Sequence, residues 1–290
     1  MEMDLQTLLF GIYPRSERLR REYGRWERGM IGSEEVVTII SEEKSSFYEM
    51  ARTAMLDFFT DPLFNWHDIL RPVALSIEGI NLGPLRRYKE TNTFYREPLI
   101  KAVGKVGDME SFREVKDNPP FPVFHRIPGK SYLHFLPGIY SFIRMSSLHC
   151  SFEEAVSGLE RAYSKIVDQL SIENLLIYEP LEVENIDIYS GLASTVSLFL
   201  VLPQFTGDHK KTNVGAHSII SHDPYKFARQ CEVPGVMLVD ALSTKVGDRI
   251  VDKVRSFTDD FDKIIVSNNE SFDFLPRVIA DRKLMNFRGN

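Results

Sequence analysis

Three acidic residues that follow short apolar runs are the residues whose type and position could do chemistry. Apolar runs of about four to eight residues are typical of strands buried in a parallel sheet. A carboxylate left unpaired beside such a core is costly, and in a β/α barrel the carboxyl ends of the strands face the active site. We therefore expect these side chains to line one cavity. They are Glu179 after residues 175–178, Asp240 after residues 236–239, and Glu270 after residues 264–266.

Such a set of carboxylates has more than one interpretation. It could act in acid/base catalysis, it could supply oxygen ligands to a hard metal ion, or its members could be ordinary polar residues of loops. Glu179 is the strongest candidate for a pocket residue, because Pro180 lacks an amide donor and must end the strand beside it. The alternative for Glu179 is a structural role in holding a neighbouring loop.

The surrounding sequence predicts the elements that position these acids. In the last third of the chain, strand and helix patterns follow one another, which favours a parallel sheet with right-handed crossovers. The length of 290 residues fits one barrel, which takes about 250 residues. We predict an α/β fold, a (β/α)8 TIM barrel in one domain over residues 1–290, with an N-terminal helical extension. The expected strands are residues 5–10, 130–138, 175–178, 196–202, 235–239 and 263–266.

Helices are expected between and before these strands. A stripe of Leu19, Tyr23, Trp26 and Met30 has helical spacing. Ser33 is expected to cap a second helix that keeps its period to Phe58, and residues 81–98, which show no clean period, are expected to be a loop. The other expected helices are residues 65–80 with a break at Pro72, residues 152–170 after a capping box of Ser151 and Glu154, a helix opened by Asp223 and Pro224, and residues 246–257 and 275–284.

Composition and charge argue against several classes of protein. The net charge of −6 disfavours nucleic acid as the main partner. No apolar run reaches the roughly 18 residues of a membrane span, and the first residues lack the basic start of a secretory signal. Two cysteines are too few for a disulfide framework and fit a reducing cytosol. We expect a cytoplasmic protein without a membrane or nucleic-acid partner.

The sequence shows no motif for a soft metal, a phosphate loop or a serine nucleophile. CxxC, HxH, HxC and HExxH are all absent, as are a glycine-rich phosphate loop and GxSxG. His217 and His222 flank an expected helix start, and Cys231 precedes an expected strand, so structural roles are favoured for all three. From these signals alone the prediction is a β/α barrel with an acidic pocket.

Five stretches, in order along nearly the whole chain, together resemble the cobalamin-independent methionine synthase family. The opening stretch is similar to the N-terminal of that family's two related barrels. The stretches are residues 11–22, GIYPRSERLRRE; residues 87–95, RYKETNTFY; residues 136–141, LPGIYS; residues 177–181, IYEPL; and residues 275–284, LPRVIADRKL.

The resemblance implies a function and a set of binding residues. In that family the C-terminal barrel carries zinc, which activates the homocysteine thiol for methyl transfer from methyltetrahydrofolate. The N-terminal barrel lacks the metal and contributes to folate polyglutamate binding. The positions of this chain that the resemblance implies for substrate and folate binding are Arg15, Arg20, Arg21, Glu22, Arg87 and Asn92.

The sequence departs from the zinc-bearing barrel at each implied ligand. The histidine and first cysteine would fall on the strand that holds Phe199-Leu200-Val201, the glutamate at Asp240, and the last cysteine at Glu270. Thiolate and imidazole are the ligands that hold zinc and lower the pKa of a bound thiol. The resemblance therefore implies a chain without metal or cofactor. Tyr178 also replaces the aspartate of the family's D-E-P motif.

Three functions follow from the resemblance and the departures. The leading hypothesis is a zinc-less barrel that takes part in methyl transfer from a folate- or pterin-type donor to homocysteine, with a separate zinc-bearing methionine synthase subunit as its partner. The second is a stand-alone methyltransferase that uses Glu179, Asp240 and Glu270 as acid/base groups or oxygen ligands. The third is a structural paralogue that binds no small molecule.

Overall fold

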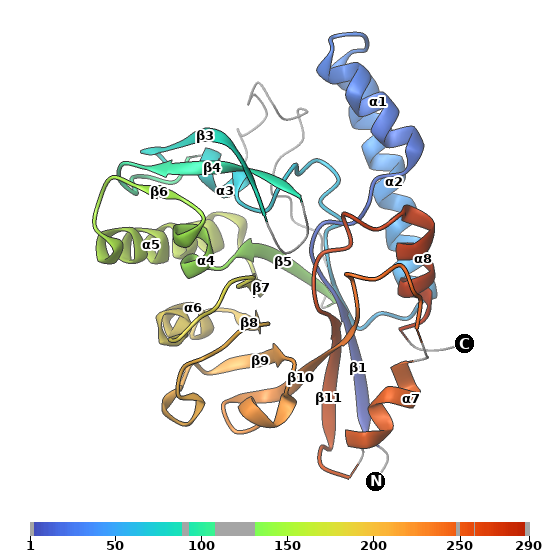
Figure 1. Ribbon diagram of the computed structural model, residues 1–290, viewed down its shortest axis with the longest axis vertical. Helices are drawn as coiled ribbons and strands as arrows, with labels where there is room; N and C mark the ends of the chain where they lie inside the picture. Colours follow the sequence, from blue (N-terminus) through green and yellow to red (C-terminus); the bar gives the residue numbers. More distant parts are fainter. Residues whose placement is uncertain (1–2, 89–92, 108–130, 248–249, 258, 288–290) are drawn as a thin grey trace.

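Among the residues that the structure describes, eight parallel strands form one closed barrel. The structure is a computed structural model and describes residues 3–88, 93–107, 131–247, 250–257 and 259–287. β1 pairs with both β2 and β11, which closes the ring (Figure 1). The predicted (β/α)8 barrel is confirmed. Its strands are β1 (Asp4–Leu9), β2 (Phe58–Thr60), β5 (Tyr132–Pro137), β7 (Asn174–Tyr178), β8 (Ser197–Val201), β9 (Ala216–Ser221), β10 (Cys231–Val239) and β11 (Lys263–Asn268).

β7 shows why the barrel strands are apolar along their whole length. Leu175, Leu176 and Ile177 are each 0% exposed, because one face of a barrel strand fills the interior and the other packs beneath the helices. The register places Ile177 beside Leu136 of β5 and Leu200 of β8. Such a strand is recognisable from the sequence as an uninterrupted apolar run.

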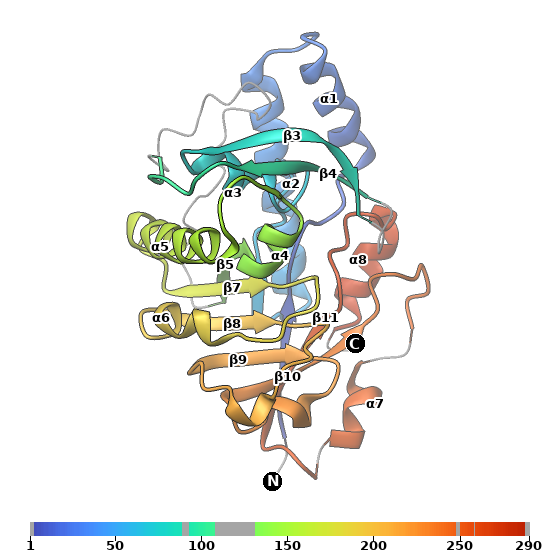
Figure 2. The same ribbon diagram turned by 60° about the vertical axis from the view of Figure 1, so that its left-hand side comes forward.

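Helices surround the barrel, and α1 projects past one end of it (Figures 1 and 2). The hydroxyl of Ser16 accepts a hydrogen bond from the amide of Leu19 and begins α1. The predicted capping box of Ser151 and Glu154 is confirmed at the start of α5. The helices are α1 (Glu17–Glu27), α2 (Ser33–Thr53), α3 (Arg71–Ser76), α4 (Ile139–Arg144), α5 (Phe152–Leu170), α6 (Ser190–Ala193), α7 (Ile250–Val254) and α8 (Arg277–Met285). No described helix combines the length and apolar character that a membrane crossing requires.

A second, small sheet lies beside the carboxyl end of the barrel. It consists of β3 (Ile80–Arg87), β4 (Phe94–Ile100) and β6 (Ser147–Leu148). β3 and β4 form an antiparallel hairpin whose register shifts between Leu82 and Leu85. The prediction of a loop over residues 81–98 was wrong, because the hairpin is largely exposed and irregular and therefore lacks a clean apolar alternation.

Four other sequence-based expectations in the first half were wrong. α2 ends at Thr53, and Phe58 already belongs to β2, which is too short to show an alternating pattern. Gly32 is the N-cap of α2, whereas the Ser33 hydroxyl accepts a hydrogen bond from Trp26 Nε1 at 3.1 Å. Met30 lies beyond the end of α1 and is 61% exposed. Residues 65–80 contain only α3, in whose first turn the proline at position 72 stands.

The second half differs from expectation mainly around β9, which was not predicted. In β9, Ala216–Ser221, polar residues stand on both sides of Ile219 and Ile220, so the strand lacks a long apolar run. Both isoleucines are nevertheless fully buried. His217 belongs to this strand, and its Nδ1 lies 2.8 Å from Glu232 Oε2. Asp223 does cap the turn that follows, but that turn is a short 3-10 helix, Pro224–Phe227. Helix α7 likewise covers only part of the expected residues 246–257.

Candidate active site

Glu179 occupies the predicted place at the end of β7 but is enclosed by donors. It is 0% exposed, and its carboxylate accepts hydrogen bonds from the amides of Tyr140 at 3.1 Å and Ser141 at 2.8 Å. The hydroxyl of Tyr189 also donates to it. Burial raises the pKa of Glu179, and these hydrogen bonds oppose that rise. The carboxylate therefore ties the first turn of α4 to β7.

Gly138 explains the short L-P-G stretch that precedes α4. A Cβ atom at Gly138 would lie 1.9 Å from Cδ of Glu179, so only glycine leaves room for the carboxylate. The pairing of a glycine before α4 with a glutamate after β7 is thus one packing unit, which fits the structural alternative for Glu179.

Asp240 follows β10 and lines a hollow that Glu179 and Glu270 do not line. It is exposed, its Oδ1 accepts a hydrogen bond from the amide of Leu242 at 2.9 Å, and its carbonyl accepts one from Lys283 Nζ at 2.8 Å. It lines a separate hollow with residues of the β10–α7 loop and α8. The expectation of three carboxylates in one cavity is therefore wrong, because Asp240 lines a separate hollow and Glu179 is enclosed by hydrogen-bond donors.

Glu270 lies at the barrel mouth and pairs with the residue that replaces the family's aspartate. Tyr178 donates its hydroxyl to Glu270 Oε2 at 2.7 Å, and the amide of Ser271 donates to Oε1 at 2.8 Å. Burial, and then the charge of Glu270, raise the pKa of Tyr178 well above its usual value, which keeps its phenol a proton donor. The two departures from the family pattern thus contact each other.

A cavity opens at the carboxyl ends of the strands, and we call it the mouth cavity. Measured with the solvent at its opening it holds about 470 Å³. Residues that follow β1, β2, β7 and β11 and the β3–β4 hairpin surround it. Its lining residues are Ile12, His67, Asp68, Ile69, Tyr88, Thr93, Phe94, Tyr95, Met145, Tyr178, Pro180, Glu270, Ser271 and Asp273.

A second hollow adjoins the mouth cavity on the side of α1, and we call it the arginine hollow. The two share the residues Ile12, His67 and Asp273. The arginine hollow holds about 550 Å³, again with its solvent. Its lining residues are Ile12, Tyr13, Pro14, Arg15, Arg20, Trp66, His67 and Asp273.

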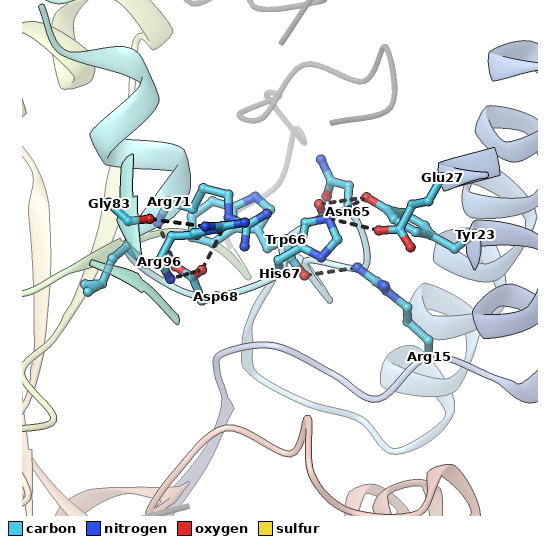
Figure 3. Close-up of polar contacts among 11 residues, drawn as sticks. Arg15, Tyr23, Glu27, Asn65, Trp66, His67, Asp68, Arg71, Gly83 and Arg96 are labelled. Atoms are coloured by element: carbon cyan, nitrogen blue, oxygen red, sulfur yellow. Dashed lines mark hydrogen bonds and ion pairs between the residues drawn. The ribbon is translucent and has the colours of Figure 1, made fainter. Parts of the chain in front are cut away.

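Arg15 is turned inward and holds the segment after β2 (Figure 3). Its Nε donates to the carbonyl of Phe64 at 2.6 Å and its Nη2 to that of Trp66 at 3.1 Å. The guanidinium lies 4.0 Å from the ring centroid of Tyr23. Burial lowers the pKa of Arg15. Its predicted role in ligand binding remains a prediction, to which the structure adds a role in shaping the hollow.

The other predicted binding residues lie in three places. Arg20 lines the arginine hollow and is exposed. Arg21 pairs with the buried Glu22 at 2.8 Å. Arg87 ends β3 and is exposed on the hairpin. Asn92 lies outside the described residues.

Two acids of the mouth cavity were missed from the sequence. Asp68 Oδ1 accepts hydrogen bonds from the amides of Leu70 at 3.0 Å and Arg71 at 2.7 Å, and Oδ2 accepts one from the amide of Arg96 at 3.1 Å (Figure 3). Its position just before α3 is a capping signal that could have found it. Asp273 lies three residues after Glu270 in a loop, and no local pattern marks it.

The cysteines lie away from this site and do not fit a zinc ion there. The Cys150 thiol donates a long hydrogen bond of 4.0 Å to the carbonyl of Ile100. Burial raises the pKa of the Cys231 thiol in β10 to about 11. Neither lines either hollow. Within the described part of the chain no group of three histidine, cysteine, aspartate or glutamate residues is placed to hold a metal ion. The strand expected to carry zinc ligands in the family holds Phe199, Leu200 and Val201, each at most 1% exposed.

Comparison with known proteins finds similarity in structure. No family model matches the sequence, and no curated protein matches it. A B12-independent methionine synthase from Shewanella sp. W3-18-1, in complex with selenomethionine, superposes with a TM-score of 0.61 at 13% identity, over 89% of this chain and 88% of that one. A putative B12-independent methionine synthase from Listeria monocytogenes gives a TM-score of 0.63 at 13% identity, over 95% and 93%. The chain therefore has the fold of B12-independent methionine synthase structures, in agreement with the resemblance seen in its motifs.

Proposed function

We propose that this chain is a methionine-synthase-like barrel that binds a folate- or pterin-type methyl donor at its mouth and works beside a separate zinc-bearing barrel that activates homocysteine. The shared fold supports the type of reaction. The observation that carries the proposal is that two hollows meet, one lined by carboxylates and tyrosines and the other by arginines. They share Ile12, His67 and Asp273.

The two hollows match the two ends of a folate. A pterin ring offers N–H donors along one edge, which suit a carboxylate, and flat faces, which suit tyrosine rings. The mouth cavity supplies Glu270 and Asp273 together with Tyr88, Tyr95 and Tyr178. The other end of a folate carries carboxylates, which suit a guanidinium.

Arg20 is the side chain best placed for that acidic end. It lines the arginine hollow, and among the described residues its guanidinium has no hydrogen-bond or ion-pair partner. Its neighbour Arg18 on α1 is instead paired with Glu42 at 2.8 Å. The two arginines therefore form a matched pair for an experiment.

The binding experiment titrates the protein with 5-methyltetrahydrofolate as the monoglutamate and the triglutamate. We expect Arg20→Ala to weaken the triglutamate about tenfold, the size of one charge-assisted hydrogen bond. Arg18→Ala is the control and should leave the affinity unchanged. The proposal would be contradicted if neither folate produced a heat of binding or a change in protein fluorescence.

The division of labour is tested with a zinc-bearing methionine synthase barrel added in trans. We expect methionine to form only in the mixture, and the two proteins to co-elute in gel filtration. The donor chemistry around the mouth, which is carboxylate, phenol and one imidazole, supports this arrangement because zinc activation of a thiol uses thiolate and imidazole ligands.

A second candidate, a stand-alone methyltransferase, is favoured by the position of Glu270 in the mouth cavity. It gains support if the chain alone forms methionine and Glu270→Gln abolishes the activity. In this alternative the cavity takes an amino acid. The Shewanella neighbour is in complex with selenomethionine, so methionine itself is the ligand to titrate.

A further inference from the structure

Asp273 occupies the junction between the two hollows and belongs to neither predicted set. It lines both of them, and the loop that carries it is firmly anchored. Asn268 Nδ2 donates to the carbonyls of Phe10 and Glu270, each at 2.9 Å, and Phe272 is 1% exposed in the core. The position of Asp273 is therefore set by the barrel.

The other two acids of the mouth cavity have their oxygens occupied. Asp68 accepts three backbone hydrogen bonds and lies 3.4 Å from the Nε of Arg71. Glu270 accepts the hydroxyl of Tyr178 and the amide of Ser271. Both are thus held as acceptors within the protein.

Asp273 is half-buried at the junction of the two hollows. Burial raises its pKa to about 6, against the opposing effect of the amides of Phe274 and Asp273 itself. A carboxyl group with a pKa near the working pH gives and takes a proton readily. Such groups in cavities are candidates for function.

Two other charged or titratable groups near Asp273 are engaged by neighbouring residues. Arg15 is engaged by two carbonyls and a ring, and His67 Nε2 lies 3.4 Å from the hydroxyl of Tyr23 and 3.7 Å from Glu27 (Figure 3). The titratable or charged side chains of the two hollows, besides Asp273, are Tyr13, Arg15, Arg20, His67, Asp68, Tyr88, Tyr95, Tyr178 and Glu270.

We propose that Asp273 is the general acid that protonates the methyl-bearing nitrogen of the donor in the mouth cavity. This inference rests on the proposed function, which supplies a tertiary amine as donor and a thiolate as acceptor. The carboxyl proton of Asp273 moves to the nitrogen, the carbon–nitrogen bond breaks with its electron pair returning to nitrogen, and the methyl carbon bonds to the thiolate sulfur. The products are an N–H amine, a thioether and the Asp273 carboxylate.

The surroundings favour the charged intermediate form of the donor. A protonated amine is attracted to the carboxylate that it leaves behind and to the faces of aromatic rings. Tyr88, Tyr95 and Tyr178 line the same cavity as Asp273, and no lysine or arginine is among the described residues that line it. An amine that remained neutral would be a poor leaving group, because it would depart as an anion.

The first experiment measures proton uptake on binding, by calorimetry at pH 7 in buffers of different ionisation enthalpy. We expect binding of 5-methyltetrahydrofolate to take up most of one proton. The 5-deaza analogue, which has carbon in place of that nitrogen, should take up little. Asp273→Asn should bind the donor without proton uptake, and the exposed Asp262→Asn, the control at the other end of β11, should behave as the wild type.

The second experiment measures methyl transfer with the zinc-bearing barrel present. We expect Asp273→Asn to lower kcat by about 100-fold or more with donor affinity little changed, and to remove the fall in rate above pH 6. Asp273→Glu, which keeps the acid, should recover part of the rate.

The outcomes separate this inference from the proposed function. If the donor binds without proton uptake, or if Asp273→Asn keeps its rate and pH profile, then Asp273 is not the acid while the folate-binding function stands. If no folate binds to the wild type, the proposed function fails and the inference fails with it.

Discussion

The loops after β7 and after β11 each carry an acid, fully buried at Glu179 and half-buried at Asp273, and the two acids differ in their hydrogen-bond donors. Glu179 is surrounded by two amides and a phenol that all donate to it. Asp273 lies at the edge of two hollows, where within the described residues the amides of its own loop, those of Phe274 and Asp273, are the donors to its carboxylate. Burial raises the pKa of both carboxyl groups. The difference teaches that a shifted pKa marks a ligand site only where the surrounding donors leave room for a ligand.

The largest expected effect on stability comes from removing the Glu179 carboxylate. Glu179→Ala removes the acceptor for the amides of Tyr140 and Ser141 and for the hydroxyl of Tyr189. Unsatisfied buried donors cost about 1–3 kcal/mol each, so we expect the free energy of unfolding to fall by about 4 kcal/mol. Urea denaturation measures it, and the exposed Glu184→Ala serves as the control. A loss below about 1 kcal/mol would show that the carboxylate does not hold α4.

The second effect tests the same unit from the other side. Gly138→Ala places a Cβ atom against the Glu179 carboxylate, and overpacking of this kind costs about 1–3 kcal/mol. The matched control is Gly191→Ala in α6, where a Cβ would meet nothing within 4 Å and where alanine should stabilise the helix by up to about 1 kcal/mol. Equal thermal shifts in the two variants would contradict the packing argument.

The third effect concerns Asp273 and depends on pH. The pKa of this carboxyl rises from 3.8 to about 6 on folding, so between these values the native state binds more protons than the unfolded state. The stability that Asp273 contributes is therefore present at low pH and is lost as the pH rises through 6. We expect the free energy of unfolding of Asp273→Asn, relative to that of the wild type, to rise by about 2 kcal/mol between pH 4 and pH 7. Urea denaturation at each pH measures this difference. Parallel pH profiles of the two proteins would refute it.

The smallest effect compares two tyrosines, one beside each region. Tyr189 donates to Glu179 and accepts from the amide of Ile139 at 2.7 Å, whereas Tyr178 donates to Glu270, which borders a cavity. We expect Tyr189→Phe to cost about 2 kcal/mol and Tyr178→Phe about 1 kcal/mol. Denaturation of the two single variants and of the double variant measures the difference, and a larger loss in Tyr178→Phe would reverse the comparison.

The strands that could be predicted from the sequence were those buried on both faces. β7, β8 and β11 are continuous apolar runs, so their position and their polar ends were visible. β2 is too short to carry a pattern, and β9 has polar residues at both ends. The β3–β4 hairpin is exposed on its outer face and therefore lacks the apolar alternation from which a strand is recognised.

The candidate site was predictable only in part. The sequence placed Glu179, Asp240 and Glu270 at strand ends, and the strand ends are where they lie. The direction of each loop decides which acid reaches the mouth, and that direction depends on contacts between distant segments, such as Ser271 with Gly11 and Lys283 with Asp240. Asp273 and Asp68 enter the cavity for the same reason. No local pattern marks Asp273, and the capping position of Asp68 does not show that it lines a cavity.

The place of β1 in the ring has a consequence for synthesis of the protein. Among the described barrel strands β1 is synthesised first, and one of its two neighbours, β11, is synthesised last. Until β11 emerges, the nascent sheet has two open edges, which are templates for pairing with other chains. Contacts between such distant segments also form slowly. The ring therefore closes only after β11 has been made, and until then the open edges should make the partly built barrel depend on chaperones.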